Sequence, residues 1–246
     1  ALDATRYALP EAELARLLSP ALVIHLDLVR ANVARMLAYC GSPERWRPHV
    51  KTTKTPAVFG ELLAAGVRQF KCATLRELRC LLETAQLAGC KIDVLLAYPL
   101  LGPALSELAR LAAEHARATL SMLCEDPAQV ERIPASVAIF VDIDPGMGRT
   151  GIPLAERDAI HDVAEAAGER FRGLHHYEGH LHGASEERRE RCFAGYRELL
   201  DLAAELERRR CAVHELVTSG TPAFLHALAY APFRELGETR HSVSPG

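Results

Sequence analysis

The chain has 246 residues, of which 49% are hydrophobic and 25% are charged. This composition is typical of one globular domain, or one domain and a fragment, with a large buried core. The formal charge of -3, with both signs interspersed, offers no broad basic surface for nucleic acid, so a small-molecule partner is expected. No apolar run approaches the roughly 20 residues that span a bilayer, and residues 1–4 lack the basic and apolar regions of a secretory signal. These features predict a cytoplasmic protein without membrane association.

The predicted elements begin with a β-rich segment at residues 21–28 and a helical pattern at residues 29–39. Short β-rich runs then alternate with amphipathic helical stretches, which is typical of repeated βα units around a parallel sheet. The helical pattern at residues 186–210 repeats apolar residues every three or four positions, which predicts an outer helix with one buried stripe. The eight predicted strands span residues 46–51, 69–73, 92–97, 119–124, 137–143, 171–177, 213–218 and 233–236.

Eight parallel βα units predict an α/β fold of the closed (β/α)₈ TIM barrel type, with an open doubly wound sheet as the alternative. The strand at residues 21–28 is left over and is expected outside the barrel. We therefore assign residues 1–40 to an N-terminal strand and helix and residues 41–240 to the barrel. The turn residues of the segment 241–246 predict a linker or the start of further structure, as in a fragment of a longer chain.

Lys51 ends the first predicted barrel strand, at the rim where such barrels keep their chemistry. Low dielectric and nearby cations can lower the pKa of an amine there and make it a nucleophile toward an aldehyde, so that it could hold pyridoxal phosphate as a Schiff base. Lys54 competes for this role, and a solvated surface lysine is the simpler alternative.

Two further strand ends carry residues suited to this cofactor. Residues 141–151 end a strand in acids and present Arg149 from a glycine-rich turn, where a guanidinium can orient a phenolate oxygen; a turn with a solvent-facing arginine is the alternative. Ser219, Gly220 and Thr221 follow the seventh predicted strand, and loops in this position often receive a phosphate.

Histidines crowd the segment at residues 173–183, where proton transfer is their expected functional use. Zinc binding through His180 and His182 is an alternative, but spacing indicates no third ligand, and at least two of the histidines are expected to be structural. The seven scattered cysteines show no paired spacing, so neither a disulfide framework nor a zinc cluster is predicted.

Together these segments resemble the fold-type III pyridoxal phosphate enzymes of the group that contains D-threonine aldolase, D-serine dehydratase and 3-hydroxyaspartate aldolase. Order and spacing both agree over nearly the whole chain. The matching segments are residues 19–23 with Asp27 and Asn32, and residues 47–52, 72–77, 95–99, 144–151, 177–180 and 219–222.

The resemblance implies that Lys51 carries the cofactor, that Arg149 approaches its phenolic oxygen and that Tyr177 lies near the pyridine ring. It also implies that Ser219, Gly220 and Thr221 hold the phosphate. Lys51 or His180 is the expected catalytic base. Since these enzymes are similar to alanine racemase in the barrel, the resemblance further implies a β-rich second domain, built largely from C-terminal sequence and completed by the strand at residues 21–28.

Two departures from the group affect these expectations. Thr53 stands where the group commonly has a histidine, so no proton transfer is assigned there. The group's metal ligands lie in the C-terminal domain, which these residues do not include, so a divalent metal is expected only for a complete enzyme and no metal ligand is assigned.

The resemblance implies a lyase acting on D-β-hydroxy amino acids, by retro-aldol cleavage or by dehydration and deamination, and a homodimer. The alternatives are an amino-acid racemase, a non-catalytic pyridoxal phosphate carrier, and a barrel in which Lys51 attacks a substrate carbonyl without the cofactor.

Overall fold

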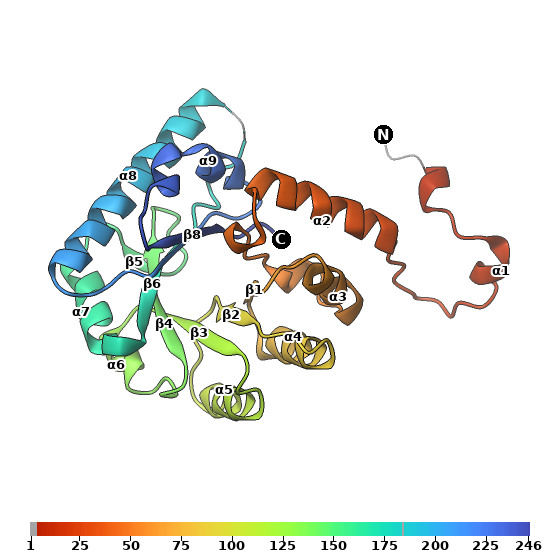
Figure 1. Ribbon diagram of the computed structural model, residues 1–246, viewed down its shortest axis with the longest axis horizontal. Coiled ribbons are helices and arrows are strands. Elements are labelled where there is room, and N and C mark those ends of the chain that lie inside the picture. The colour runs from red at the N-terminus through yellow and green to blue at the C-terminus, as the bar shows by residue number, and fades with distance from the viewer. Residues whose placement is uncertain (1–3, 184) are drawn as a thin grey trace.

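Seven strands form a parallel sheet in the order β1-β2-β3-β4-β6-β7-β8 in the computed structural model, which describes residues 4–183 and 185–246 (Figure 1). A short strand, β5 (Ile152–Pro153), pairs only with β4. The strands of the main sheet are β1 (Gln69–Cys72), β2 (Asp93–Leu96), β3 (Thr119–Cys124), β4 (Ala138–Asp144), β6 (Phe171–His176), β7 (Glu215–Thr218) and β8 (Arg240–Val243). Six of the eight predicted strands are therefore confirmed within a few residues.

Residues 46–49 close this sheet into a barrel. The segment bridges in parallel to β8 through Trp46 and to β1 through His49. Arg47 N–H donates to the carbonyl oxygen of Val243 at 2.9 Å, and Lys71 N–H donates to that of Pro48, also at 2.9 Å. This segment is the eighth barrel element, so the predicted closed barrel is confirmed, although its pairing is too short to form a full strand.

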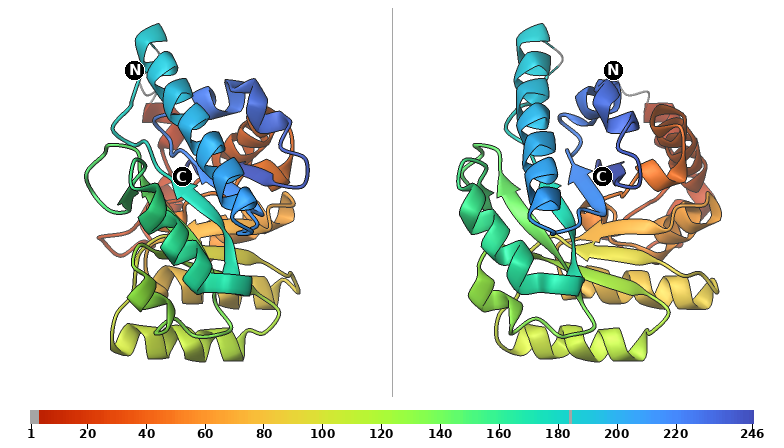
Figure 2. Two further views of the ribbon diagram at one scale, coloured as in Figure 1. Left: turned by 90° about the vertical axis from the view of Figure 1, so that its left-hand side faces the viewer. Right: turned by 60° about the vertical axis from the view of Figure 1, so that its left-hand side comes forward.

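Helices surround the strands on the outside of the barrel (Figures 1 and 2). Helix α4 begins at the N-cap Thr74, whose Oγ1 accepts from the N–H of Glu77, and the Glu77 carboxylate accepts from the N–H of Ala73, the residue before the cap. The α-helices are α1 (Glu11–Leu14), α2 (Leu26–Cys40), α3 (Pro56–Ala64), α4 (Leu75–Leu87), α5 (Pro103–Glu114), α6 (Pro127–Val130), α7 (Arg157–Ala167), α8 (Glu186–Arg208) and α9 (Phe224–Ala229). The 3₁₀ turns are η1 (Ala4–Tyr7), η2 (Pro43–Arg45), η3 (Val50–Thr52), η4 (Gly168–Arg170) and η5 (Ala231–Arg234).

Helix α8 confirms the outer helix predicted at residues 186–210. Its buried residues lie at helical spacing and form one stripe toward the barrel. None of the helices in the described part of the chain combines the length and the apolar character needed to cross a bilayer.

The strand predicted at residues 21–28 is absent from this structure. Residues 21–25 have no ladder partner among the described residues, and α2 already begins at Leu26. A single extended segment is not stable as a strand unless it pairs with a neighbour. Figure 1 shows that the chain before α2, including α1, extends away from the barrel, while residues 1–3 of the predicted N-terminal unit lie outside the described residues.

The strand predicted at residues 233–236 is wrong. Pro232 lies in η5, and Phe233 stacks its ring on His241 with centroids 3.9 Å apart. The last strand is β8, which the sequence pattern did not predict because His241 and Ser242 make the segment polar. The barrel therefore extends past residue 240, into the segment that was expected to be a linker.

Buried charges fill the barrel where its strands begin. The Arg47 guanidinium is fully buried and pairs with Glu215 at 2.9 Å and with Asp93 at 2.8 Å. Arg172 and Arg240 also pair with these carboxylates. Above them lies an apolar layer of Leu95, Leu123, Phe140 and Val217. These layers separate the charged base of the barrel from its opposite rim.

This network predicts acid sensitivity. Burial acts to raise the pKa of Glu215, but Arg47 and Arg240 outweigh it and hold that pKa below its ordinary value. A depressed pKa stabilises the fold above the ordinary carboxyl pKa of about 4, and this contribution is lost as the pH falls through the folded value. We expect the melting temperature to decrease as the pH is lowered below about 4. Glu215→Gln should lower it at pH 7 and flatten its acid dependence, as circular dichroism can measure; an unchanged acid limb would contradict this.

Candidate active site

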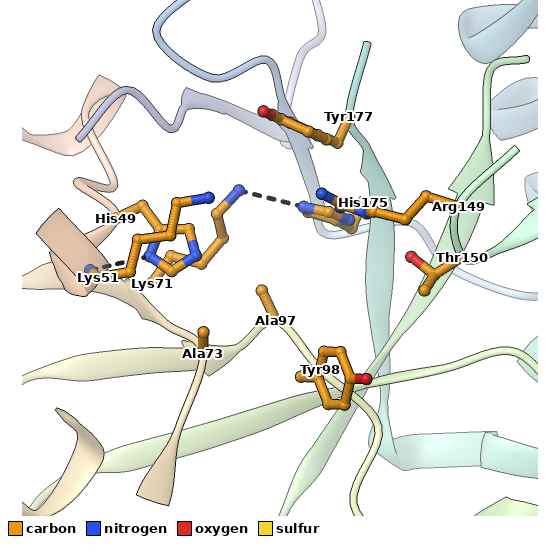
Figure 3. Close-up of a pocket in the computed structure, with 10 residues that line it drawn as sticks. All are labelled: His49, Lys51, Lys71, Ala73, Ala97, Tyr98, Arg149, Thr150, His175 and Tyr177. Atoms are coloured by element: carbon orange, nitrogen blue, oxygen red, sulfur yellow. Dashed lines mark hydrogen bonds between the residues drawn. The ribbon is translucent and has the colours of Figure 1, made fainter. Parts of the chain in front are cut away.

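A cavity of about 150 Å³ opens at the C-terminal ends of the strands. Figure 3 shows Lys51 and Lys71 entering it from one side and Arg149 from the other, with Tyr177 between them at one edge. The cavity is lined by His49, Lys51, Lys71, Ala73, Ala97, Tyr98, Arg149, Thr150, His175 and Tyr177. Three of the predicted site residues, Lys51, Arg149 and Tyr177, therefore come together from distant parts of the chain.

Lys51 lies in η3, directly after the segment that closes the barrel. Its backbone N–H donates to His49 Nδ1 at 3.3 Å. Burial, followed by the charge of Lys71, lowers the pKa of His49 to about 2, so its ring is neutral and can accept this bond. Lys54 pairs with Glu77 at 3.3 Å and is absent from the cavity lining, which favours Lys51 as the site lysine.

Thr53, where the resembling group commonly has a histidine, turns toward the backbone. Its hydroxyl donates to the carbonyl oxygen of Val50 at 3.3 Å, which supports the turn that carries Lys51. The residue is absent from the lining of the cavity that contains Lys51.

Arg149 is presented by the glycine-rich turn after β4. The Asp144 carboxylate organises this turn by accepting from the N–H groups of Gly146, Met147 and Gly148 at 2.7–3.1 Å. The Arg149 guanidinium lies over the Tyr177 ring, 4.8 Å from its centroid. Arg149 is exposed, but it is exposed at the mouth of the cavity.

Tyr177 follows β6 and occupies space that two glycines leave open. A Cβ at Gly179 would lie 2.4 Å from its ring atoms, and one at Gly220 would lie 2.6 Å away. The absence of side chains at these two positions therefore fixes where the aromatic ring stands.

Gly220→Ala is expected to displace the Tyr177 ring and to weaken binding of a planar ligand in the cavity about fivefold. One lost aromatic contact is worth on the order of 1 kcal/mol. Titration with pyridoxal phosphate, followed by fluorescence, measures the change. Gly60→Ala is the matched control, because a Cβ at Gly60 in α3 meets nothing within 4 Å; equal affinity in the two variants would contradict the expectation.

Ser219, Gly220 and Thr221 form a loop directly after β7. Ser219 has a positive φ of 49°, and its N–H donates to the Glu178 carboxylate and to the carbonyl oxygen of His176, both at 3.2 Å. Among the described residues, the N–H groups of Gly220 and Thr221 have no acceptor. The loop does not line the cavity itself, but Gly220 touches Tyr177, which does. Unpaired N–H groups in a tight loop suit an anion.

Glu178 is a buried residue of the site to which the sequence assigned no role. Its carboxylate accepts from His176 Nδ1 at 3.3 Å, from the Tyr196 hydroxyl and from the N–H of Ser219. Burial acts to raise the pKa of Glu178, but His176 and the hydrogen bonds lower it, so the group is ionised. Glu178 therefore holds the loop after β7 in place. The sequence did not reveal this role, because a glutamate followed by a glycine is also typical of an exposed turn.

Lys71 and His175 form a buried pair to which the sequence assigned no individual role. Lys71 is the third residue of β1, only 3% exposed, and its Nζ lies 3.2 Å from His175 Nε2. The sequence feature that could have indicated Lys71 is a lysine in the middle of a short predicted strand, at residues 69–73.

The structure does not bring His180 into this cavity. His180 lines a separate hollow with Asp144, Leu154 and Arg191, and its Nδ1 is buried without a partner. His182 Nδ1 donates to the carbonyl oxygen of Gly179 at 3.4 Å. Within the described residues, the grouping of possible metal ligands is His161, Asp162 and Glu165 on α7, so no third ligand joins His180 and His182 there.

The family model described as the alanine racemase N-terminal domain matches residues 24–239. No curated protein matches the chain.

Three solved structures illustrate the structural likeness. The D-threonine aldolase of Filomicrobium marinum is 24% identical, with a TM-score of 0.78 over 95% of this chain and 62% of that one. The D-threo-3-hydroxyaspartate dehydratase of Delftia sp. HT23 is 23% identical, with a TM-score of 0.73 over 93% and 60%. The lysine decarboxylase of Selenomonas ruminantium is 20% identical, with a TM-score of 0.69 over 97% and 66%. The chain thus spans about three fifths of the length of the first two and shares the fold of all three.

Proposed function

Because this chain belongs to the alanine racemase N-terminal domain family, we propose that it is the cofactor-binding barrel of a pyridoxal phosphate-dependent lyase acting on D-β-hydroxy amino acids. The observation that carries the proposal is the convergence of Lys51, Arg149 and Tyr177 on one cavity at the active rim of the barrel. The D-threonine aldolase and the dehydratase among the structural neighbours support the choice of substrate class.

The residues present fit the cofactor. Lys51 offers an amine for its aldehyde, and Arg149 offers a guanidinium for its phenolic oxygen. Tyr177 offers an aromatic face for its ring. The N–H groups of Gly220 and Thr221, which have no acceptor in the described part of the chain, offer donors for its phosphate.

The cofactor, when bound, supplies a conjugated ring that withdraws electrons from the substrate Cα. Which substrate bond breaks then depends on how the protein orients the substrate and where it places acids and bases. With a β-hydroxy substrate, retro-aldol cleavage needs a base at the β-hydroxyl, whereas dehydration needs a base at the Cα proton and an acid at the leaving hydroxyl. The cavity contains two amines for these roles, Lys51 and Lys71, and does not contain His180.

Racemisation is the second candidate. A racemase needs one acid–base group on each face of the substrate, and the second amine, Lys71, favours this reading over a carrier without catalytic groups. A homodimer and a divalent metal are further proposals, which rest on the resemblance to the aldolase and dehydratase group.

The test is a visible spectrum of the purified protein with pyridoxal phosphate, followed by borohydride reduction and peptide mapping. We expect an absorbance band of the bound cofactor and a pyridoxyl group on Lys51. A screen of D-threonine, D-serine and D-3-hydroxyaspartate against their L-isomers then tests the substrate class. A folded protein that acquires no pyridoxyl group would contradict the proposal.

A further inference from the structure

We propose that Lys71 is a second catalytic amine of the cavity, which exchanges a proton with the β-oxygen of the substrate and is oriented by His175 and Asp142. This inference rests on the proposed function. It assigns proton transfer at the β-oxygen, for which the sequence motifs identified no residue, to Lys71.

The fold aims Lys71 at the cavity. Its neighbours in β1, Phe70 and Cys72, are fully buried in the core outside the strands, so Lys71 faces the inside of the barrel. It is 3% exposed, yet its side chain lines the cavity beside Lys51 (Figure 3). A lysine amine placed in this way meets a bound ligand instead of bulk water.

A chain of hydrogen bonds supports the amine from behind. His175 Nδ1 donates to Asp142 Oδ1 at 2.7 Å, and Asp142 Oδ2 accepts from the Thr150 hydroxyl at 3.0 Å. The bond to the carboxylate fixes the His175 tautomer that carries its proton on Nδ1. His175 Nε2 is then an acceptor, 3.2 Å from Lys71 Nζ. Lys71 therefore donates one N–H to His175, and a neutral Lys71 keeps its lone pair for the cavity.

The surrounding charges favour an amine that changes protonation near neutral pH. Burial, followed by the charge of Lys51, lowers the pKa of Lys71 to about 7. Burial, followed by Lys71, lowers the pKa of His175, so its ring stays neutral. The groups that face Lys71 are the cations Lys51 and Arg149, the rings of His49, His175 and Tyr177, and the acids Asp142 and Glu178, which oppose the cations.

The proposed proton transfer is balanced within the cavity. In retro-aldol cleavage the β-hydroxyl O–H bond breaks and its proton forms an N–H bond on Lys71. A carbonyl then forms at the β-carbon, and the electron pair of the Cα–Cβ bond stays on Cα. The resulting ammonium donates a hydrogen bond to His175 Nε2, while His175 Nδ1–H stays hydrogen-bonded to the Asp142 carboxylate. In dehydration Lys71 starts instead as an ammonium protonated from solvent and donates a proton to the leaving hydroxyl, so that the Cβ–O bond breaks and water departs. Lys51 takes the Cα proton, and the electron pair of that C–H bond forms the Cα–Cβ double bond. Lys51, next to the cofactor aldehyde, is the amine left for Cα.

An electrostatic role is the competing explanation. A permanently charged Lys71 could simply attract the substrate carboxylate. Lys71→Arg separates the two roles, because arginine keeps the positive charge but does not release its proton near neutral pH.

The first readout needs neither cofactor nor substrate. This chain contains four lysines, so the full-length protein labelled with ¹³C at lysine Cε gives few signals from this region, and Lys71→Arg identifies the one that disappears. We expect the Lys71 signal to titrate near pH 7 and Asp142→Asn to move the midpoint downward. Exposed Lys91 serves as the internal reference. A Lys71 signal that titrates in the ordinary lysine range, at about pH 10, would overturn the proposal.

The second readout compares substrates with and without a β-oxygen on the cofactor-loaded full-length protein. Lys71→Arg is expected to lose at least about 100-fold in turnover of D-threonine or D-serine, the usual contribution of a positioned acid or base. It should keep solvent deuterium exchange at Cα of D-alanine and the pyridoxyl group on Lys51. Lys91→Arg should match the wild type in all three assays.

The outcomes separate this inference from the proposed function. Turnover within about threefold of wild type in Lys71→Arg, against the 100-fold expected of an acid or base, would overturn the role of Lys71. Loss of D-alanine exchange together with turnover would overturn its assignment to the β-oxygen. A wild-type protein that acquires no pyridoxyl group would instead contradict the proposed function, while the Lys71 titration could still be measured. Lys71→Met, without a charge, replaces Lys71→Arg if the arginine variant does not fold.

Discussion

Lys51→Ala is expected to abolish the visible band of the bound cofactor and the pyridoxyl modification of the peptide that contains residue 51. The reason is that Lys51 is the lining amine on the rim segment before α3, whereas Lys54 pairs with Glu77 outside the cavity. Turnover of any D-amino-acid substrate should fall by at least about 100-fold, since the same amine serves as an acid or base.

Lys54→Ala is the matched control for this substitution, because it removes a lysine from the same turn without changing the cavity lining. It should retain the band and the modification. Mass spectrometry of the reduced, digested protein decides between the lysines. A pyridoxyl group that moves to Lys71 in Lys51→Ala would show that both amines reach the aldehyde, and an unchanged band without modification at either lysine would exclude the cavity as the attachment site.

Arg47→Met is expected to destabilise the fold by about 3 kcal/mol, the lower end of the range for breaking a buried ion pair by removing one partner. Arg47 is fully buried, and its removal leaves Glu215 and Asp93 without their central partner, although Arg172 and Arg240 remain near them. Chemical denaturation followed by circular dichroism measures the loss as a lower midpoint at unchanged slope.

Arg79→Met provides the comparison, because Arg79 pairs with Glu107 on the exposed face of the helices. Exposed pairs contribute little to stability. If Arg47→Met unfolds at the same denaturant concentration as Arg79→Met, the buried network does not stabilise the barrel. The arginine would then serve only to neutralise the two acids.

The barrel was predictable because the βα alternation is local. Most of the strand runs between helices are short and mainly apolar, as in β2, β3 and β4, and this pattern can be recognised without knowledge of the partner strands. The strand predictions at residues 21–28 and 233–236 failed because strand formation also depends on partners that are distant in the sequence. Both contain β-forming residues, but whether such a segment becomes a strand depends on a neighbour that the local pattern does not reveal. The last strand, β8, was not predicted because its residues His241 and Ser242 are polar, although inside the fold they contact Thr218, the Glu215 carboxylate and the Phe233 ring.

The site was predictable where a motif marks a strand end and unpredictable where contacts cross the barrel. Lys51 and Arg149 stand in recognisable segments at the active rim. Lys71 and Glu178 acquire their roles only through register, which places β1 opposite β6 and brings the end of β6 beside the loop after β7. His180 shows the reverse, since its segment carries a motif but its side chain turns into another hollow.

The closing segment at residues 46–49 has a kinetic consequence. The hydroxyl of Ser244 donates to the carbonyl oxygen of Arg47, a contact between residues 197 positions apart. Contacts of such high sequence separation form late, because the entropy of ordering the intervening chain must be overcome first. During synthesis the strands β1 to β6 can therefore begin to pair before residues 46–49, and with them Lys51, are fixed against β8. We expect the affinity for the cofactor to appear in the last phase of refolding, after most of the helical signal has returned.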